Sequence, residues 1–161
     1  MAEGQENRPP VEPPRGMYPA RLDDKGRMKF PAVFQEYIKA LAEPKLFVTS
    51  LDRRIARIYP LAEWRVNEKI FDEYLEDPDD AANIAFNAQD LGAETEMDGQ
   101  GRIGFSPELR RELKLEDAPV HLWAYKGHIE VLSEEIYQQR RQQASTANAD
   151  AVKKLQRAGL R

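Results

Sequence analysis

Apolar and polar positions alternate along this chain in short runs, and the period of each run predicts a strand or a helix. Alternation with β-branched and aromatic residues predicts strands at 18–22, 28–30, 46–49, 55–59, 94–97, 103–105, 120–125 and 129–132. Apolar residues at helical spacing predict helices at 31–42, 60–75, 81–91, 106–115 and after Ser133. This mixture of elements is typical of an α+β protein.

The predicted helix at 60–75 carries a row of large apolar side chains: Leu61, Trp64, Ile70, Phe71, Tyr74 and Leu75. We interpret them as core or as a subunit contact rather than as a ligand site. The acidic segment 76–80 then breaks this helix. Its carboxylates suggest a metal site at first sight, but Asp-Pro followed by acids is typical of a helix N-terminal cap. Gly92 suits the C-terminal end of the helix that follows.

One stretch of the sequence occurs twice. The first copy reads Leu22-Asp23-Asp24-Lys25-Gly26-Arg27-Met28-Lys29-Phe30-Pro31. The second copy reads Met97-Asp98-Gly99-Gln100-Gly101-Arg102-Ile103-Gly104-Phe105-Ser106-Pro107, and Asp23 and Asp98 are 75 positions apart. The strand-to-helix junction at 58–64 is echoed at 131–137. We infer an internal duplication of a β-β-α-β-β unit with a trailing helix. Because one unit of about 50 to 60 residues buries only a marginal core, we expect units to pair within or between chains.

The residue types of this motif predict a tight turn. A short Asp side chain accepts hydrogen bonds from backbone amides two residues on, and Gly takes a left-handed conformation without a Cβ clash. Asp23 and Gly26 therefore shape the first turn, and Asp98 and Gly101 shape the second. The flanking strands make each turn the closure of a short hairpin, and a proline then opens a helix.

The arginine that follows each turn, Arg27 or Arg102, has two alternative roles. Either it pairs with the Asp four positions earlier and makes the turn rigid, or the hairpin presents its guanidinium to a phosphate or to guanine O6 and N7. The duplication, and the neighbouring Arg21, Lys25 and Lys29, add weight to the second role.

Charge is unevenly distributed along the chain. The net charge is −4, whereas nucleic-acid-binding domains are usually basic. The stretch 21–29 nevertheless has four basic residues against two acidic ones, while acidic residues crowd at 72–80. The overall acidity weakens a DNA-binding interpretation without removing it. The chain has no cysteine, which excludes disulfides, thiol catalysis and cysteine-type zinc sites and fits a reducing cytoplasm.

Catalytic chemistry has little support in the sequence. Neither of the two histidines, His121 and His128, has a serine, cysteine or carboxylate partner at a recognisable spacing. No glycine-rich loop precedes a helix in the phosphate-binding pattern. No apolar run approaches the roughly 20 residues that cross a bilayer, and the N-terminus lacks the apolar core of a signal peptide. We expect a soluble binding protein with no cofactor and no metal; an enzyme of unknown type is the weakest alternative.

Both ends of the chain are polar. Residues 1–16 are rich in proline and charge, which predicts a disordered or polyproline-like arm that is either solvated or a ligand for a proline-binding domain. Residues 138–161 form a polar tail with scattered basic residues. This tail either extends the last helix or frays, and it either stays solvated or contacts DNA nonspecifically.

The two motifs together resemble the MraZ family, whose members consist of two tandem AbrB/SpoVT-like swapped-hairpin modules. The strings Leu22–Arg27 and Asp98–Arg102 match the family's repeated Asp-x-x-x-Arg motif, and Tyr59–Trp64 matches its strand-to-helix junction. The resemblance implies an α+β fold, a duplicated β-β-α-β-β swapped-hairpin barrel with added helices, assembled into a ring oligomer.

The resemblance to the MraZ family covers residues 17–137 and implies a first module at 17–75, a linker helix at 76–92 and a second module at 93–137. The function that it implies is that of a bacterial cytoplasmic, nucleoid-associated transcription regulator. Such a protein acts on the promoter of the division and cell-wall gene cluster and binds short direct repeats of double-stranded DNA.

Carried over to this chain, the resemblance implies that Arg27, Arg102 and Lys25 bind DNA. The neighbouring basic residues Arg21 and Lys29 complete the set of DNA-binding candidates. Because Gln100 stands where the first copy has Lys25, we expect the first motif to dominate the DNA contact.

Two features depart from the family pattern. The arm before Met17 is longer than expected, and Gly104, inside a predicted strand, weakens pairing or marks a bulge or a close approach. The arm, the acidity and the unequal second motif support an alternative function. In that alternative the chain is a non-catalytic self-assembling scaffold or partner-binding module that has lost DNA binding.

Overall fold

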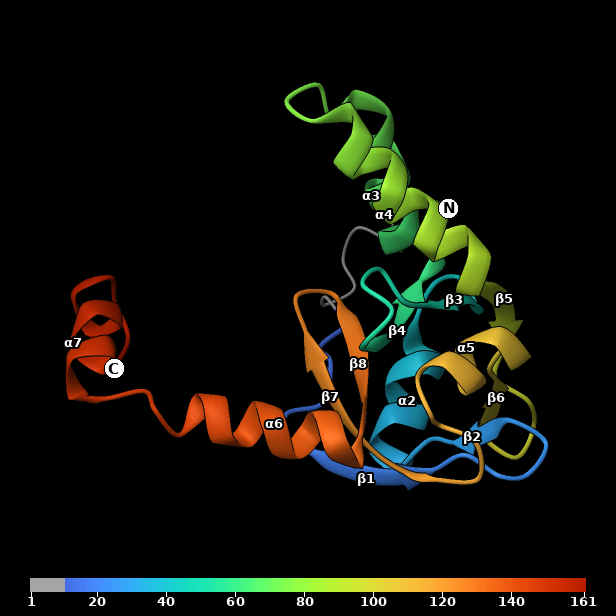
Figure 1. The fold of residues 1–161 in the computed structure, drawn as a ribbon. Helices are drawn as coiled ribbons and strands as arrows, with labels where there is room; N and C mark the ends of the chain where they lie inside the picture. Colours follow the sequence, from blue (N-terminus) through green and yellow to red (C-terminus); the bar gives the residue numbers. More distant parts are fainter. Residues whose placement is uncertain (1–10) are drawn as a thin grey trace, which may run out of the picture.

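A computed structural model describes residues 11–161 (Figure 1). Its strands are β1 (Tyr18–Arg21), β2 (Arg27–Lys29), β3 (Lys45–Thr49), β4 (Ala56–Pro60), β5 (Ala93–Glu96), β6 (Arg102–Gly104), β7 (Pro119–Tyr125) and β8 (His128–Ser133). Its helices are α2 (Ala32–Ala40), α3 (Leu61–Glu73), α4 (Pro78–Leu91), α5 (Pro107–Glu112), α6 (Glu134–Ala144) and α7 (Ala149–Arg157). Every strand predicted from the sequence is present with slightly shifted ends, and the predicted α+β class is confirmed.

The strands form one large sheet and one small ribbon. The sheet is antiparallel and has six strands in the order β1-β7-β8-β4-β3-β5, while β2 and β6 pair with each other in the ribbon. Neighbours in the sheet come repeatedly from opposite halves of the chain, so the two halves are interleaved rather than side by side.

The two halves complete each other's sheet. Strand β1 from the first half pairs with β7 from the second, with Tyr18 opposite Leu122. In return, β5 from the second half pairs with β3 from the first, with Ala93 opposite Val48. Tyr18 and Ala93 are separated by the same 75 positions as the two motif aspartates. Their partners Leu122 and Val48 are equivalent as well, since they lie opposite Val131 and Ile58 in the two halves, so the two exchanges share one register.

The remaining pairings between the halves join β2 to β6 and β4 to β8. Met28 of β2 is opposite Ile103 of β6, and Arg57 of β4 is opposite Glu130 of β8. In each pair a residue faces its own counterpart from the other copy of the repeat. The strand pairing therefore repeats as the sequence motif does, with the pattern of a two-fold axis inside one chain.

The larger of two hydrophobic clusters is a core shared by both halves. Phe34 of α2 is fully buried and packs edge to face on Tyr18, with ring centroids 5.5 Å apart. Other fully buried members of this core come from both copies of the repeat: Met28, Ile58, Ile103 and Leu122. A second, smaller cluster around Trp64 and Phe47 anchors the base of α3 on the sheet.

The strands that flank each turn differ from the predicted hairpin in one respect. In the first copy they share a single bridge, Leu22 to Met28, and then separate. Beyond it, β1 pairs with β7 and β2 pairs with β6. Turn residues specify how the chain reverses, but the partner of a strand is decided by core packing over long sequence separations.

Gly104 is a regular strand position, not the irregularity that the sequence suggested. It lies opposite Arg27 in the ribbon, and a Cβ built on it would meet no atom of the described residues within 4 Å. The expected bulge or close approach is therefore absent at this residue.

The helices also differ from the prediction at their ends. Helix α3 stops at Glu73, so Tyr74 and Leu75 lie beyond it. Helix α4 begins at Pro78 because the side chain of Asp77 accepts a hydrogen bond from the Asp80 amide, 3.0 Å away. This confirms the cap interpretation of the acidic segment, and residues 11–161 contain no cluster of three or more potential metal ligands. The polar tail does not fray: it extends α6 and then forms α7.

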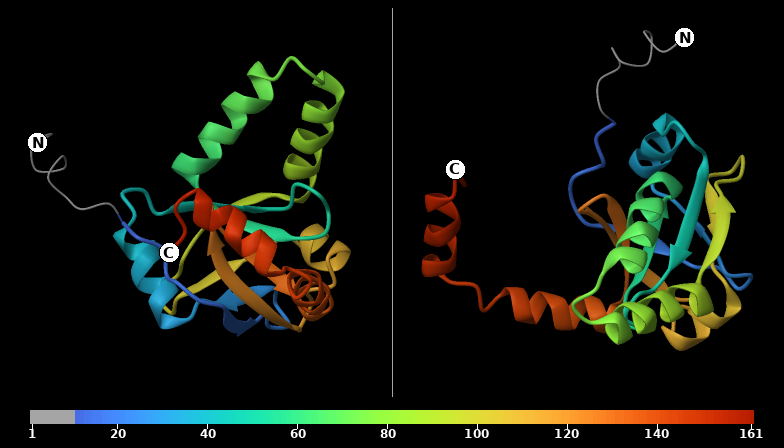
Figure 2. Two further views of the ribbon diagram at one scale, coloured as in Figure 1. Left: turned by 90° about the vertical axis from the view of Figure 1, so that its left-hand side faces the viewer. Right: turned by 90° about the horizontal axis from the view of Figure 1, so that it is seen from above.

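Two helical pieces project from the body of the protein. Figure 1 shows the α3–α4 hairpin leaving the sheet in one direction and α6 carrying α7 away in another, and the two views of Figure 2 agree. Of the apolar row predicted on α3, Leu61 and Trp64 are buried, whereas Ile70, Tyr74 and Leu75 are exposed. Within the part of the chain that is described, no helix has the length and hydropathy that a bilayer crossing requires.

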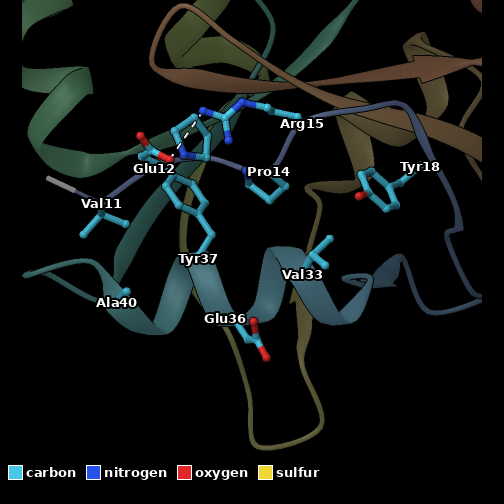
Figure 3. Close-up of a pocket in the computed structure, with 10 residues that line it drawn as sticks. Val11, Glu12, Pro14, Arg15, Tyr18, Val33, Glu36, Tyr37 and Ala40 are labelled. Atoms are coloured by element: carbon cyan, nitrogen blue, oxygen red, sulfur yellow. Dashed lines mark hydrogen bonds and ion pairs between the residues drawn. The ribbon is translucent and has the colours of Figure 1, made fainter. Parts of the chain in front are cut away.

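The described part of the proline-rich arm, residues 11–16, lies along α2 without regular secondary structure. Figure 3 shows Tyr37 of α2 pointing toward this segment, with Glu12 and Arg15 paired above it. This part of the arm therefore lines a pocket with α2 while most of its residues stay exposed. The prediction for residues 1–10 lies outside the described residues.

Replacing Phe34 with Ala tests the shared core. We expect the free energy of unfolding to fall by about 3 to 5 kcal/mol, because a large buried side chain is lost and leaves a cavity. Val33→Ala, at the neighbouring position whose side chain is 40% exposed, should cost less than about 1 kcal/mol. Guanidinium unfolding curves measure both, and equal losses would contradict this description of the core.

Candidate nucleic-acid interface

The first motif turn is held together by one carboxylate. Oδ1 of Asp23 accepts hydrogen bonds from the amides of Lys25 and Arg27, each 2.9 Å away, and Oδ2 accepts one from Nε of Arg27 at 3.1 Å. The backbone closes the same turn, because the Gly26 amide donates to the Asp23 carbonyl and the Asp23 amide donates to the Arg27 carbonyl. A carboxylate at this position thus orders both the turn and the arginine that follows.

The second turn repeats these contacts. Oδ1 of Asp98 accepts from the amides of Gln100 and Arg102, and Oδ2 accepts from Nε of Arg102 at 2.9 Å. Gly26 and Gly101 have φ angles of +76° and +79°, the left-handed region that favours glycine. The geometry of the two turns therefore follows from the residue types that they share.

The same hydrogen bonds lower the pKa of both aspartates. The Arg27 amide, followed by the Lys25 amide and the Arg27 guanidinium, lowers the pKa of Asp23 below its ordinary value of 3.8. The Arg102 amide and guanidinium act in the same direction on the pKa of Asp98. The shift favours the ionised carboxylate, which is the form that accepts hydrogen bonds from the turn.

Each turn is supported by the helix of the other half. A Cβ added to Gly26 would collide with the side chain of Arg110 on α5, and one added to Gly101 would collide with Gln35 on α2. Gln35 donates to the carbonyl of Phe30, and Arg110 likewise donates to the carbonyl of Phe105. Gln35 and Arg110 were not predicted from the sequence, although their 75-residue separation marks them as equivalent positions in the duplication.

The two turns are also tied directly to each other. The Phe30 amide donates to the Gly101 carbonyl at 2.8 Å, and the Phe105 amide donates to the Gly26 carbonyl at 2.9 Å. Two turns far apart in the sequence are thereby held at opposite ends of one short ribbon.

The β2–β6 ribbon has an apolar face and a basic face. Met28 and Ile103 are buried in the core, and side chains alternate along a strand. The side chains of Arg27, Lys29 and Arg102 therefore point to the other face, where Lys29 is opposite Arg102 and Arg27 is opposite Gly104. Gly104 occupies the position equivalent to Lys29, so the second copy contributes one basic side chain less.

Two further candidates lie away from this face. Lys25 is exposed at the tip of the first turn, where Gln100 stands in the second. Arg21 lies on β1, and its guanidinium donates to the carbonyl of Asp117 at 2.7 Å and to the carboxylate of the same residue at 3.2 Å. The structure thus brings Arg27, Lys29 and Arg102 together and directs Arg21 to another segment.

The two alternative roles of the motif arginines are compatible in this geometry. Within residues 11–161, each guanidinium uses only Nε for its aspartate and leaves the two Nη atoms without a hydrogen-bond partner. The side chains of Arg27 and Arg102 are 35% and 26% exposed, respectively. A guanidinium fixed through Nε retains its outer edge for a second acceptor such as a phosphate oxygen.

Both histidines have carboxylate partners, which their spacing in the sequence did not reveal. Nε2 of His121 lies 2.6 Å from Oε2 of Glu134, and the imidazole stacks on Tyr137. Nε2 of His128 lies 3.3 Å from Oε2 of Glu130 on the same strand. The first pair joins β7 to α6, and the second lies within β8.

Replacing Gly26 or Gly101 with Ala tests the turn geometry. Each replacement should lower the free energy of unfolding by more than about 1 kcal/mol, because the residue has positive φ and its Cβ meets a supporting side chain. Gly99→Ala is the matched control, since this glycine is in the second turn and an added Cβ would meet nothing within 4 Å in the part of the chain that is described. Thermal or denaturant unfolding measures all three, and a loss at Gly99 as large as at Gly101 would contradict this description.

Comparisons with known proteins agree on one family. The family model described as "MraZ protein, putative antitoxin-like" matches residues 92–159. Three relatives share the name "Transcriptional regulator MraZ". The protein from Acidobacterium capsulatum is 34% identical over 128 residues, which are 78% of this chain and 85% of the relative.

The protein from Koribacter versatilis is 40% identical over 101 residues, covering 61% of this chain and 67% of the relative. The protein from Desulfitobacterium hafniense (strain DSM 10664 / DCB-2) is 32% identical over 146 residues, covering 90% and 98%. Since similarity at this level extends over nearly the whole length of such relatives, this chain belongs to the MraZ family.

Proposed function

We propose that this protein is a transcription regulator that binds double-stranded DNA through the basic face of the β2–β6 ribbon. The observation that carries the proposal is the convergence of Arg27, Lys29 and Arg102 on one outward face, between two rigid turns. The names of its relatives as transcriptional regulators support the same conclusion. The protein has no enzymatic activity in this proposal and needs no cofactor.

The fold is, in this proposal, a duplicated swapped-hairpin barrel of the AbrB/SpoVT kind. Support comes from the reciprocal exchange of β1 and β5 and from the common register of the two exchanges. The first module spans 17–75, the linker helix 76–92 and the second module 93–137, with strands passing between the modules.

The ribbon suits DNA for physical reasons. A two-stranded ribbon fits the major groove, and arginine can donate two hydrogen bonds to guanine O6 and N7 or to a phosphate. Lys25 and Lys29 in the first copy correspond to Gln100 and Gly104 in the second. The first copy therefore supplies most of the contact, whereas Arg21 is held by Asp117 away from the ribbon.

Self-association reconciles this function with a net charge of −4. Each ribbon supplies only a few phosphate contacts, but copies joined in a ring bind one DNA molecule with a high effective concentration. A ring whose copies repeat by rotation matches short direct repeats. The target is the promoter of the division and cell-wall gene cluster, and the protein works in the cytoplasm in association with the nucleoid.

A non-catalytic scaffold that assembles without binding DNA is the second candidate. The acidity of the chain and the weaker second motif favour it. The two candidates differ in what the ribbon does, since a scaffold has no need of outward basic side chains at Lys29 or Lys25.

Titration against DNA from upstream of the protein's own gene, at several salt concentrations, tests this function. Lys29→Ala should weaken binding about three- to tenfold and reduce the slope of log affinity against log salt by roughly one, because one phosphate contact is lost. Arg27→Ala should abolish measurable binding and leave the oligomer intact. Arg27→Lys should recover only part of the affinity, since lysine keeps the charge but not the planar fork.

Arg65→Ala is the matched control, because this exposed arginine of α3 pairs with Glu43 away from the ribbon. It removes the same charge and should leave affinity and slope nearly unchanged. If the wild-type protein does not bind the DNA, or if Arg27→Ala binds it as tightly as wild type, the regulator is refuted and the scaffold is favoured.

A further inference from the structure

An apolar groove with a basic rim lies at the base of α6. Its volume is about 290 Å³, and its lining includes Met17, Trp123, Leu132 and Tyr137. Arg140 and Arg141, on consecutive positions of α6, also line it. Two contacts fix the orientation of the Trp123 side chain: its Nε1 donates to Glu130 at 2.9 Å, and its ring stacks on Tyr125. The DNA-binding ribbon uses none of these residues.

The tip of the α3–α4 hairpin has the complementary character. Leu75 is 83% exposed and Tyr74 is 41% exposed, so two large apolar side chains lie at the end of a projecting piece. They are surrounded by acidic residues, since 72–80 contains six carboxylates and no basic residue. The tip therefore presents an apolar knob with a negative rim.

We propose that the α3–α4 tip of one copy docks into the α6 groove of a second copy of this chain. Tyr74 and Leu75 enter between Trp123 and Tyr137, while Glu73 and Glu76 approach Arg140 and Arg141. Burial of the apolar side chains supplies the attraction, and the opposite charges at the rim select the partner. This inference rests on the proposed self-association and specifies the surfaces that carry it.

Charge distinguishes the tip from helix α7, a second projecting piece that carries exposed apolar side chains. Helix α7 presents the exposed apolar side chains of Val152 and Leu155. However, its polar positions include Lys153, Lys154 and Arg157, which would meet Arg140 and Arg141 with like charge. The acidic tip is therefore the occupant that the groove favours.

The two surfaces lie on different parts of the molecule, so the contact joins copies head to tail. Figure 1 shows the hairpin and α6 leaving the body in different directions. An interface between two different surfaces leaves each copy with one free tip and one free groove. Such a contact continues from copy to copy until it closes as a ring, which is the assembly that multivalent DNA binding requires.

Cross-linking in the full-length chain tests the contact directly. The protein has no native cysteine, so Leu75→Cys combined with Ala144→Cys introduces the only two thiols. Ala144 lines the groove. A short bis-maleimide reagent should link these thiols between chains and give a ladder of multimers on a denaturing gel. Phe86→Cys with Ala144→Cys is the control, because Phe86 is 65% exposed on the same hairpin but lies away from its tip.

Charge reversal with sedimentation velocity gives a second measurement. Arg140→Glu with Arg141→Glu, and separately Glu73→Lys with Glu76→Lys, should each raise the concentration needed for assembly by at least about tenfold. An equimolar mixture of the two variants should assemble like wild type, since every tip then finds a groove of opposite charge. Asp77 is left unchanged because it caps α4.

Three results would overturn the proposal. One is a cross-linked ladder that is absent or no stronger than in the control. Another is wild-type assembly by both charge-reversal variants. The third is loss of DNA affinity without loss of assembly when Arg140 and Arg141 are reversed, which would assign the groove to nucleic acid. None of these results depends on whether Lys29 contacts DNA, so failure here is distinguishable from failure of the proposed function.

Discussion

Neither half of this chain closes its own sheet, and the rest of the structure depends on that constraint. The backbone N–H and C=O groups of a strand need partners, and β1 finds them on β7 while β5 finds them on β3. Along with this exchange, β2 pairs with β6. The two turns are joined because the carbonyls of Gly26 and Gly101 accept hydrogen bonds from the amides of Phe105 and Phe30. Two copies of one short motif thereby become the ends of a single ribbon.

The functional proposals follow from where charged side chains lie: basic ones on the ribbon and acidic ones on the projecting α3–α4 hairpin. One face of the ribbon enters the core through Met28 and Ile103, which leaves the basic side chains on the other face. The aspartate of each turn accepts a hydrogen bond from Nε of the following arginine, and this bond fixes the direction of the guanidinium. Acidic residues are instead concentrated at 72–80, on the tip of the α3–α4 hairpin. A chain of negative net charge can thus offer a basic surface to DNA and an acidic one to its neighbour.

The sequence predicted local features well and long-range ones poorly. The turn geometry follows from Asp23 and Gly26 because the contacts lie within five residues, and the cap at Asp77 is equally local. The bridge between Leu22 and Met28 is also local, but the pairing of β1 with β7 depends on a core assembled from both halves. Side chains that support a turn from another helix, such as Arg110 behind Gly26, were missed for the same reason. The DNA contacts of Arg27 and the ring assembly remain proposals.

The most direct test of the central claim adds a charge to the ribbon rather than removing one. Gly104 lies on the basic face at the position equivalent to Lys29, and a Cβ added there would meet no atom of residues 11–161 within 4 Å. Gly104→Lys should therefore bind the same promoter DNA about three- to tenfold more tightly, with a salt slope steeper by roughly one. Gln89→Lys adds the same charge at an exposed position on α4 and should have little effect. If Gly104→Lys binds no better than Gln89→Lys, the β2–β6 ribbon is not the surface that contacts DNA.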